Sequence, residues 1–357
     1  MSIIGQITQI GVKGGAPRSD RPQPPGRPDR SGRLDRSGRP DRPQRSHRHL
    51  RRAGGASLVT ALAVSCAATA GPTGTGPGPR LDEPLAAAGA GLPLGAAQRA
   101  EAEYVAASLA AYADRLAQAE ARRVAAAERW GLAAVPLRPP PPPARKPDLV
   151  SSPGHLRGDG LPPVITRVPT EDKVVFFTID DGWEKDPELL TMLRELDIPY
   201  SAFLSDYVAK DDYGYFRRMH RDGAAVHNHT LHHKELPTLS YERQRREICD
   251  MQEVLAAEIG VTPRLFRPPY GAYDRDTLRA AATCGIEAVP LWMEEAWTRR
   301  FDYARTDRVL HPGDIVLTHF RGPEEWPGGG TMTDMVRRAV NEVTRQGFAF
   351  ARLEDYV

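Results

Sequence analysis

Net charge, cysteines and long apolar runs are all scarce in this sequence of 357 residues. Its 48 lysines and arginines nearly balance its 46 aspartates and glutamates, so the net charge of +2 gives no argument for binding nucleic acid. The apolar run within residues 53–70 has about ten residues, whereas a membrane-spanning helix needs about 20. The overall composition therefore points neither to a nucleic-acid binder nor to a spanning protein.

Residues 1–52 are expected to form a disordered, arginine-rich tail. From residue 18 onward they contain almost no apolar side chains, and the short repeat that begins at Gly26 recurs at Gly32 and Gly38. Such a segment buries too little apolar surface to offset the loss of chain entropy. Because aspartates are interspersed among the arginines, we expect no nucleic-acid partner.

Residues 53–70 have the layout of a secretory signal, since basic residues precede the apolar run and small residues follow it. We therefore expect a secreted or cell-envelope protein. Cys66 follows Ala63-Val64-Ser65, which resembles a bacterial lipoprotein cleavage box, although Ala63 stands where leucine is usual. Lipidation of Cys66 would be the only attachment to a membrane, and ordinary cleavage a few residues later is the alternative.

The other two cysteines leave two possibilities. In an exported protein Cys249 and Cys284 are able to pair. Both nevertheless lie in apolar segments that have a helical pattern, where buried free thiols are common. We therefore favour free thiols.

Composition divides the remaining chain into four parts: a Gly/Pro/Ala linker (71–95), an alanine-rich helix (96–132), a proline-rich linker (133–160) and a globular domain (161–357). Good helix formers without proline predict one long helix that Gly131 stops. It acts as a spacer, packs on the main domain, or forms a coiled coil. Consecutive prolines in the next part predict a stiff polyproline spacer. We expect the protein to be a monomer.

Short apolar runs alternate with helical patterns through residues 161–357. Such alternation is typical of buried parallel strands joined by crossover helices. About seven strands in fewer than about 200 residues are too few for a full eightfold barrel. The predicted fold class is α/β, with a distorted, incomplete (β/α)7-type barrel that follows the disordered tail and the long helix.

Five of the apolar runs end in clusters of chemically capable side chains. The clusters are Asp180-Asp181-Gly182, His229 to His233, Arg267 to Gly271, Trp292 to Glu295, and Thr318-His319. The C-terminal ends of barrel strands meet on one face of the fold, which is where such proteins do their chemistry. The sequence therefore predicts that carboxylates, imidazoles and a guanidinium surround one point.

The histidine cluster indicates a metal site. His229 and His233 are four residues apart, close enough to bind one ion, and a carboxylate would complete three protein ligands with an open position for water. This ligand set suits catalytic Zn²⁺, and Co²⁺ or Ni²⁺ also fit. Of Asp180 and Asp181, one can bind the metal while the other accepts a proton from water. In isolation these residues also fit solvated loop histidines and a tight turn.

Two other clusters add groups that such a site needs. Arg267 would pair with a carboxylate and keep it ionised, and the prolines after it would aim the N–H of Tyr270 or Gly271 at a developing oxyanion. His319 is placed to protonate a leaving group, although in isolation it also fits a satisfied core histidine.

In this order the clusters resemble the motifs of the polysaccharide deacetylases with NodB homology, carbohydrate esterase family four, over roughly residues 170–355. The resemblance implies a distorted barrel that removes N- or O-acetyl groups from a glycan with a divalent metal. It implies the following roles: Asp180 as general base, Asp181, His229 and His233 as metal ligands, Arg267 as the residue that positions the base, the Tyr270 N–H as oxyanion hole, and His319 as acid.

The segment from Trp292 to Trp297 departs from the fourth motif of that family, which has an acidic residue directly before a tryptophan. Ala296 stands there in this chain, so Glu294 or Glu295 would have to support the acid histidine. Trp292 and Trp297 are expected to bind substrate. Trp183, Trp297 and Trp326 either stack on sugar rings or pack in the core.

The sequence thus predicts a hydrolase that deacetylates an extracellular glycan, with peptidoglycan first, chitin-type oligomers and acetylated xylan next. A glycoside hydrolase that uses Asp180 with Glu294 or Glu295 is one alternative, but it leaves the paired histidines unexplained. A non-haem iron oxygenase would not need Asp180 beside Asp181. A non-catalytic wall-binding protein on the same fold is the third alternative, against which the complete metal trio argues.

Overall fold

The computed structural model describes residues 95–357. The predictions for residues 1–52, 53–70 and 71–94, including lipidation of Cys66, lie outside the described residues. Within residues 95–357, no helix is both long enough and apolar enough to cross a membrane.

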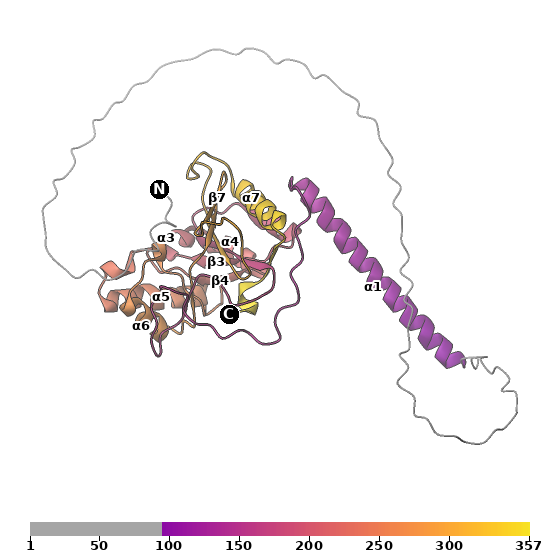
Figure 1. Ribbon diagram of the computed structural model, residues 1–357, viewed down its shortest axis with the longest axis horizontal. Helices are drawn as coiled ribbons and strands as arrows, with labels where there is room; N and C mark the ends of the chain where they lie inside the picture. The colour runs from indigo at the N-terminus through magenta and orange to yellow at the C-terminus, as the bar shows by residue number, and fades with distance from the viewer. Residues whose placement is uncertain (1–94) are drawn as a thin grey trace, which may run out of the picture. The chain divides into compact units, whose positions relative to one another are not determined.

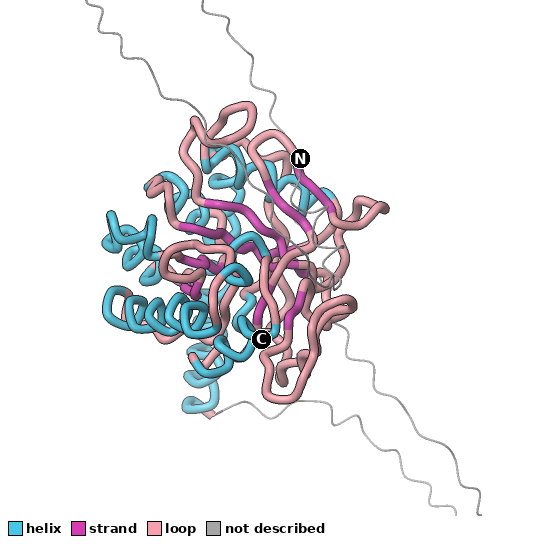
Figure 2. Tube along the Cα trace, turned by 90° about the vertical axis from the view of Figure 1, so that its left-hand side faces the viewer, coloured by secondary structure: helices cyan, strands magenta, loops and turns pink. Residues whose placement is uncertain are grey.

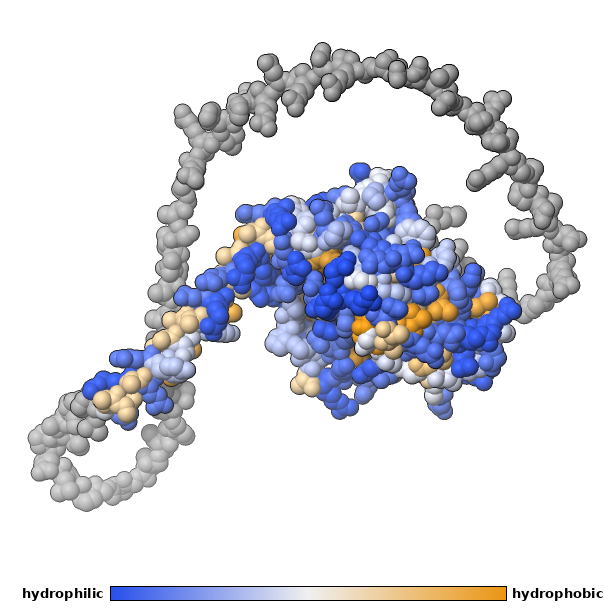
Figure 3. Space-filling view, turned by 180° about the vertical axis from the view of Figure 1, so that it is seen from behind, coloured by the Kyte–Doolittle hydropathy of each residue, from blue (hydrophilic) through white to orange (hydrophobic). Residues whose placement is uncertain are grey.

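The predicted long helix is present as α1 (Ala96–Arg129), and Gly131 follows it with a φ of 66°. The last turns of α1 pack on the domain, where Ala126 and Ala127 are buried and Arg129 forms an ion pair of 2.7 Å with Glu195. The earlier turns are exposed and extend away from the domain (Figure 1). Polar and apolar side chains are mixed along this exposed part (Figure 3).

Parallel strands form the centre of the domain, and the helices lie outside them (Figure 2). The middle strand is β2 (Val174–Asp181), which pairs in parallel with β3 (Ser201–Leu204), β8 (Ile315–His319) and β9 (Ala349–Phe350). β4 (Ala225–Asn228) extends the sheet beyond β3. β2 is buried on both faces, as its apolar residues predict, and its C-terminal end lies level with those of its neighbours.

The sheet continues on both sides but does not close as one regular barrel. β6 (Glu294–Ala296) runs parallel to β8, and β7 (Phe301–Tyr303) returns antiparallel to β6. On the other side, the isolated pairs Asn228 with Phe266 and Leu265 with Ala288 continue from β4. They lead to a small parallel pair of β1 (Val164–Ile165) and β5 (Val289–Pro290). The fold is therefore α/β with an incomplete barrel, as predicted, whereas the antiparallel β6–β7 hairpin was not anticipated.

Amphipathic helices cover the strands. They are α2 (Pro187–Glu195), α3 (Asp206–Ala209), α4 (Tyr213–Arg221), α5 (Tyr241–Glu258), α6 (Arg275–Thr283) and α7 (Met332–Arg345), with 3₁₀ turns η2 (Lys210–Asp212), η3 (Leu236–Thr238), η4 (Pro269–Gly271) and η5 (Leu353–Asp355). Side-chain caps fix where several begin; for example, Asp186 accepts a hydrogen bond from the Glu188 N–H at the start of α2.

The proline-rich segment 133–160, for which the sequence predicts a stiff polyproline spacer, lies along the domain. Pro136 is buried and its carbonyl accepts a hydrogen bond from Arg123 of α1. Leu137 pairs in parallel with Ala349 of β9, and Ser152 donates a backbone hydrogen bond of 2.8 Å to Val164 of β1. These contacts tie the end of α1 to the barrel.

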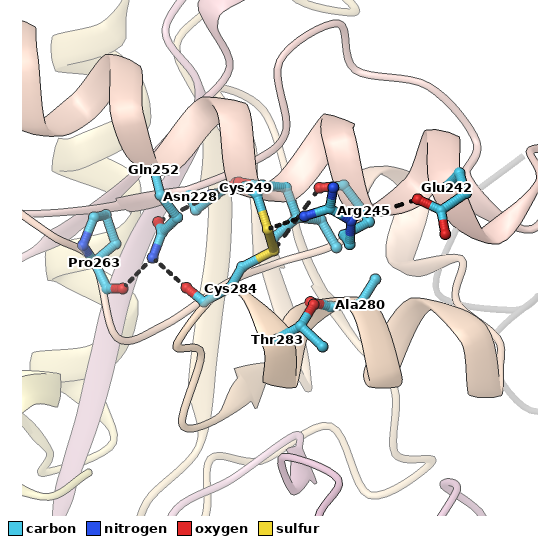
Figure 4. The surroundings of a disulfide bond; sticks show 10 residues. Asn228, Glu242, Arg245, Cys249, Gln252, Pro263, Ala280, Thr283 and Cys284 are labelled. Carbon is cyan, nitrogen blue, oxygen red and sulfur yellow. Dashed lines mark hydrogen bonds and ion pairs between the residues drawn. A yellow bond between two sulfur atoms is a disulfide. The ribbon is translucent and has the colours of Figure 1, made fainter.

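Cys249 of α5 and Cys284 at the end of α6 form a disulfide (Figure 4), so the expectation of free thiols was wrong. The helical pattern of both segments was correct, but sequence alone does not show that α5 and α6 pack side by side. Gln252, one turn after Cys249, donates hydrogen bonds to the carbonyls of Pro263 and Cys284 and accepts one from Asn228. The disulfide thus belongs to a network that reaches the end of β4.

Candidate active site

The structure brings the strand-end clusters together around one cavity of about 90 Å³. Its lining consists of Asp180, Asp181, His229, His233, Tyr270, Trp292, Glu295, Leu317, His319 and Arg321. Each predicted cluster contributes to this cavity, with Tyr270 as the contribution of the arginine–proline segment. The prediction that the strand ends converge is therefore confirmed.

Asp181, His229 and His233 offer three ligand atoms that all lie within 4.8 Å of one another. The Oδ1 atom of Asp181 is 3.4 Å from His229 Nε2 and 3.2 Å from His233 Nε2. Among the described residues this buried oxygen has no partner in hydrogen-bonding geometry. A buried oxygen and two imidazole nitrogens that face one point are the donor set of a divalent cation with three protein ligands. The three residues therefore fit a metal ion.

Neighbouring groups hold the imidazole of His229 and the backbone of His233. The Nδ1 of His229 is 2.7 Å from the carbonyl oxygen of Arg267, to which it donates a hydrogen bond. That bond leaves the lone pair of Nε2 free toward the cavity, which is the arrangement of metal-binding histidines. The backbone N–H of His233 donates to Thr230 Oγ1 at 3.1 Å, and the backbone N–H of Thr230 donates to Asn228 Oδ1 at 2.9 Å.

Several residues of the site have a backbone in the left-handed region. The φ angles of Asp181, Thr230, His233 and Tyr270 are 79°, 71°, 52° and 62°. Non-glycine residues rarely adopt this region, and such strain persists where surrounding contacts hold it. At Asp181 the bend turns the carboxylate from the strand into the cavity, so that two adjacent aspartates serve the same site.

Asp180 is buried and pairs with Arg267, whose Nη1 lies 2.7 Å from Asp180 Oδ1. The guanidinium is itself fully buried and also donates to Thr178 Oγ1 at 2.9 Å and to the Pro290 carbonyl at 2.7 Å. Burial raises the pKa of Asp180 above its usual value, and the charge of Arg267 limits that rise. The predicted pairing of Arg267 with a carboxylate is therefore present.

Asp181 differs from its neighbour in its electrostatics. Burial alone would raise the pKa of Asp181, but the imidazoles of His229 and His233 outweigh it and hold the pKa well below the usual value. The pKa values of the two adjacent carboxylates are thus shifted in opposite directions, which suits Asp180 to act as a base and Asp181 to act as a permanently ionised ligand.

His319 lies at the end of β8, directly beside Asp180 in the β2–β8 register. Its Nδ1 is 3.6 Å from Oε1 of Glu295. Burial lowers the pKa of His319 to about 3, and burial raises the pKa of Glu295 to about 7. Both carboxylate oxygens of Glu295 are buried without a hydrogen-bond partner among the described residues. The carboxyl group of Glu295 therefore lies close enough to the imidazole of His319 to share a proton with it.

Adjacent residues of a strand point to opposite sides, and this decides between the two glutamates of β6. Glu295 faces the cavity. Glu294 instead has its Oε1 atom 3.4 Å from Nη1 of Arg305, and Arg305 also forms an ion pair with Asp314. Of the two candidates to replace the acidic residue absent at Ala296, Glu295 is the one that lies beside His319.

The tryptophans of the domain are divided between the core and the surface. Trp292 lines the cavity but is only 5% exposed, and Trp297 is 7% exposed beneath the guanidinium of Arg300, 4.1 Å from its ring centre. Trp297 does not line the cavity; its ring packs in the core with its centre 6.5 Å from that of His319, and its binding of substrate stays a prediction. Trp326 is also buried. Trp183, in contrast, is 50% exposed next to the site.

Arg321 lines the cavity and was not singled out from the sequence. It follows His319 by two residues, and that position after a strand end was the signal that could have found it. A larger cavity of about 680 Å³ lies between α1 and α2 and is lined mainly by arginines. Ion pairs such as Arg129 with Glu195 and Arg138 with Glu120 neutralise much of its charge, and it contains no histidine.

Sequence comparison finds a family and several proteins that this chain resembles. The sequence model of the family described as polysaccharide deacetylase matches residues 167–289. An uncharacterized protein of Streptomyces coelicolor is 42% identical over 202 residues, which cover 56% of this chain and 80% of that protein. A chitooligosaccharide deacetylase of Sinorhizobium fredii is 31% identical over 162 residues, 43% of this chain and 75% of that protein. A peptidoglycan-N-acetylmuramic acid deacetylase of Bacillus subtilis is 23% identical over 197 residues, 52% of this chain and 72% of that protein.

Proposed function

Because the chain belongs to the polysaccharide deacetylase family and is a hydrolase of acetylated glycans, we propose that it deacetylates an extracellular glycan with a divalent metal ion. One observation carries this proposal. Asp181, His229 and His233 face one point in the cavity that also contains Asp180 and His319. A metal trio, a base and an acid are the groups that hydrolysis of an unactivated amide or ester needs.

The substrate class is supported by the relatives. One is named for peptidoglycan N-acetylmuramic acid and another for chitooligosaccharides. We propose peptidoglycan as the first candidate, chitin-type oligomers of N-acetylglucosamine as the second and O-acetylated xylan as the third. The reaction adds water across the acetyl bond and releases acetate together with a free amine or hydroxyl.

Asp181, His229 and His233 would hold the metal, and Zn²⁺, Co²⁺ and Ni²⁺ all suit one carboxylate with two imidazoles. When bound there, such an ion supplies a water whose pKa is near neutrality and polarises the acetyl carbonyl. The hydrogen bond from His229 Nδ1 to the Arg267 carbonyl keeps the imidazole in the tautomer that metal binding requires.

Asp180 is the proposed base. Its carboxylate faces the same cavity and is held by Arg267, and its Oδ2 atom is 3.7 Å from His229 Nε2. Burial raises the pKa of Asp180, which makes this carboxylate a stronger proton acceptor than an exposed aspartate. Arg267 keeps it ionised and fixes its direction.

His319 is the proposed acid, and Glu295 is the proposed source of its proton. A histidine whose pKa is lowered to about 3 is neutral at pH 7 and cannot donate without support. Glu295, with a pKa raised to about 7 and 3.6 Å from Nδ1, is able to carry the proton or to stabilise the imidazolium as the amine leaves. The Tyr270 N–H, at the backbone bend after Pro269, is the proposed donor to the oxyanion.

We also propose that the protein is exported and acts as a monomer, with lipidation of Cys66 as its attachment to a membrane. The disulfide between Cys249 and Cys284 supports export, since disulfides persist in oxidising compartments.

Acetate release from a panel of acetylated glycans, with and without chelator, tests the proposal. We expect release from at least one peptidoglycan or N-acetylglucosamine substrate, loss of release with chelator, and recovery on adding Zn²⁺ or Co²⁺. Glycan cleavage that chelator does not affect would favour the two-carboxylate glycoside hydrolase. Glycan binding without any acetate release would favour a non-catalytic binding protein.

A further inference from the structure

The cavity of about 680 Å³ between α1 and α2 shares no lining residue with the catalytic cavity. Ligand cavities in proteins commonly measure about 300–1,000 Å³, so this one has room for an organic molecule. Five of its lining side chains are arginines, namely Arg122, Arg123, Arg129, Arg138 and Arg194. Four of them come before residues 167–289, which the family model matches, so the cavity belongs largely to a part of this chain outside that match.

Positive charge is in excess among the residues that line this cavity, since only Glu195 and Asp197 are acidic. Nη1 of Arg129 lies 2.7 Å from Oε1 of Glu195, and Nη2 of Arg138 lies 3.1 Å from Oε2 of Glu120. In both pairs the arginine side chain is more than half exposed. Because exposed ion pairs are weak, these guanidinium groups are able to turn toward a bound anion.

Arg122 and Arg123 keep hydrogen-bond donors for which the described residues supply no acceptor. Arg123 is only 9% exposed; its Nη1 donates to Glu120 Oε2 at 2.9 Å, and its Nη2 donates to the Pro136 carbonyl. Its Nε is buried and has no hydrogen-bond partner within residues 95–357. The exposed guanidinium of Arg122 forms neither a hydrogen bond nor an ion pair with those residues. Buried donors normally have an acceptor, so the free Nε of Arg123 indicates one that a ligand supplies.

We propose that this cavity binds the phosphate groups of an anionic polymer, a polyol chain linked by phosphate esters. Guanidinium groups bind phosphate oxygens in pairs, and one phosphate has enough oxygens to accept from several arginines. A flat lipid surface would reach the exposed Arg122 but not the recessed Arg123, and the only apolar residues of the lining are alanines, which do not anchor a protein in lipid. None of the lining residues is aromatic, so no nucleic-acid base stacks there.

Binding of such a polymer would tether the domain and leave the catalytic cavity open to a glycan. Titration of the full chain with soluble poly(glycerol phosphate), with chelator present, tests this binding apart from any acetate release. Arg122→Gln and Arg123→Gln remove the proposed contacts. Arg115→Gln is the matched control, because Arg115 is an exposed arginine of the same helix that does not line the cavity.

We expect the Kd for poly(glycerol phosphate) to rise about tenfold in Arg122→Gln and in Arg123→Gln, as for the loss of one charge-assisted hydrogen bond. The Kd should stay unchanged in Arg115→Gln. Vesicles of phosphatidylglycerol carry the same phosphate ester on a membrane, and binding of the protein to them should not change in Arg123→Gln.

Three outcomes would overturn the site: no saturable binding of the polymer to the wild type, equal losses in all three variants, or an effect of Arg123→Gln on vesicle binding alone. Because Arg123 also contacts Glu120 and Pro136, its replacement perturbs the packing of α1. Arg122→Gln removes no such contact and must show the same rise in Kd for the site to stand. A wild type that binds the polymer but releases no acetate from any glycan would sink only the proposed function.

Discussion

The buried pair of Arg267 and Asp180 gives the sharpest prediction for the site. Arg267 is fully buried, and it donates to the Asp180 carboxylate, to Thr178 and to the carbonyl of Pro290. Replacing it with methionine keeps much of the volume but leaves a buried carboxylate without its counter-charge. Removing one partner of a buried ion pair typically costs about 3–5 kcal/mol. For a domain of this size, that loss corresponds to a fall in Tm of about 6–20 °C.

Thermal unfolding of Arg267→Met, with chelator present so that bound metal does not add stability, measures this cost. Arg217→Met is the matched control, because Arg217 forms an ion pair of 3.1 Å with Glu258 in which both side chains are almost half exposed. Exposed pairs contribute about 0–1 kcal/mol, so the Tm of the control should hardly move. The double variant Asp180→Asn, Arg267→Met removes the stranded charge and should recover part of the loss. Two outcomes would refute the reasoning. The first is that the losses of unfolding free energy of the two single variants simply add in the double variant, and the second is a loss under about 1 kcal/mol in Arg267→Met.

Three further predictions concern other parts of the site and its support. His233→Ala should lower metal affinity at least about tenfold and abolish acetate release. The control is His232→Ala, which should keep both metal affinity and acetate release because the imidazole of His232 is exposed and pairs with Glu247; metal content and activity after dialysis decide between these outcomes. Burial raises the pKa of Glu295 to about 7. The protonated carboxyl group therefore contributes fully to the free energy of unfolding below the unfolded pKa, and this contribution is lost as pH rises through about 7. Between pH 5 and 8 the metal-free wild type should lose up to about 3 kcal/mol more unfolding free energy than Glu295→Gln, and equal slopes of unfolding free energy against pH would contradict this. Replacing both Cys249 and Cys284 with serine should lower the unfolding free energy by about 3–4 kcal/mol, because the disulfide closes a loop with a sequence separation of 35. An unchanged midpoint of urea unfolding would show that helix packing holds the loop without the disulfide.

The convergence of the site was predictable because parallel strands end on one face. Asp180, Asp181, His229, His233, Arg267 and His319 follow apolar runs that are strands or strand-like pairs in the structure. Their side chains had to meet once the sheet was parallel. The choice between Glu294 and Glu295 was not predictable, because it depends on which face of β6 points inward.

Burial and long-range packing account for what the sequence could not show. Trp297 was expected at the substrate, but Arg300 and Arg321 stack over its ring, at 4.1 and 4.9 Å, and it packs with the core. Cys249 and Cys284 were expected to be free, because only the contact between α5 and α6 brings them together. Both placements depend on contacts between segments far apart in the sequence, about which local patterns say little.

The most direct test of the central claim is the Asp180→Asn variant, measured for both metal content and acetate release. Asp180 lies beside the proposed metal ligands but is bound to Arg267, so the account predicts that the variant keeps about one metal ion per chain. The same variant should lose nearly all acetate release, since asparagine cannot accept a proton from water. Full activity of Asp180→Asn with its metal in place would contradict the account.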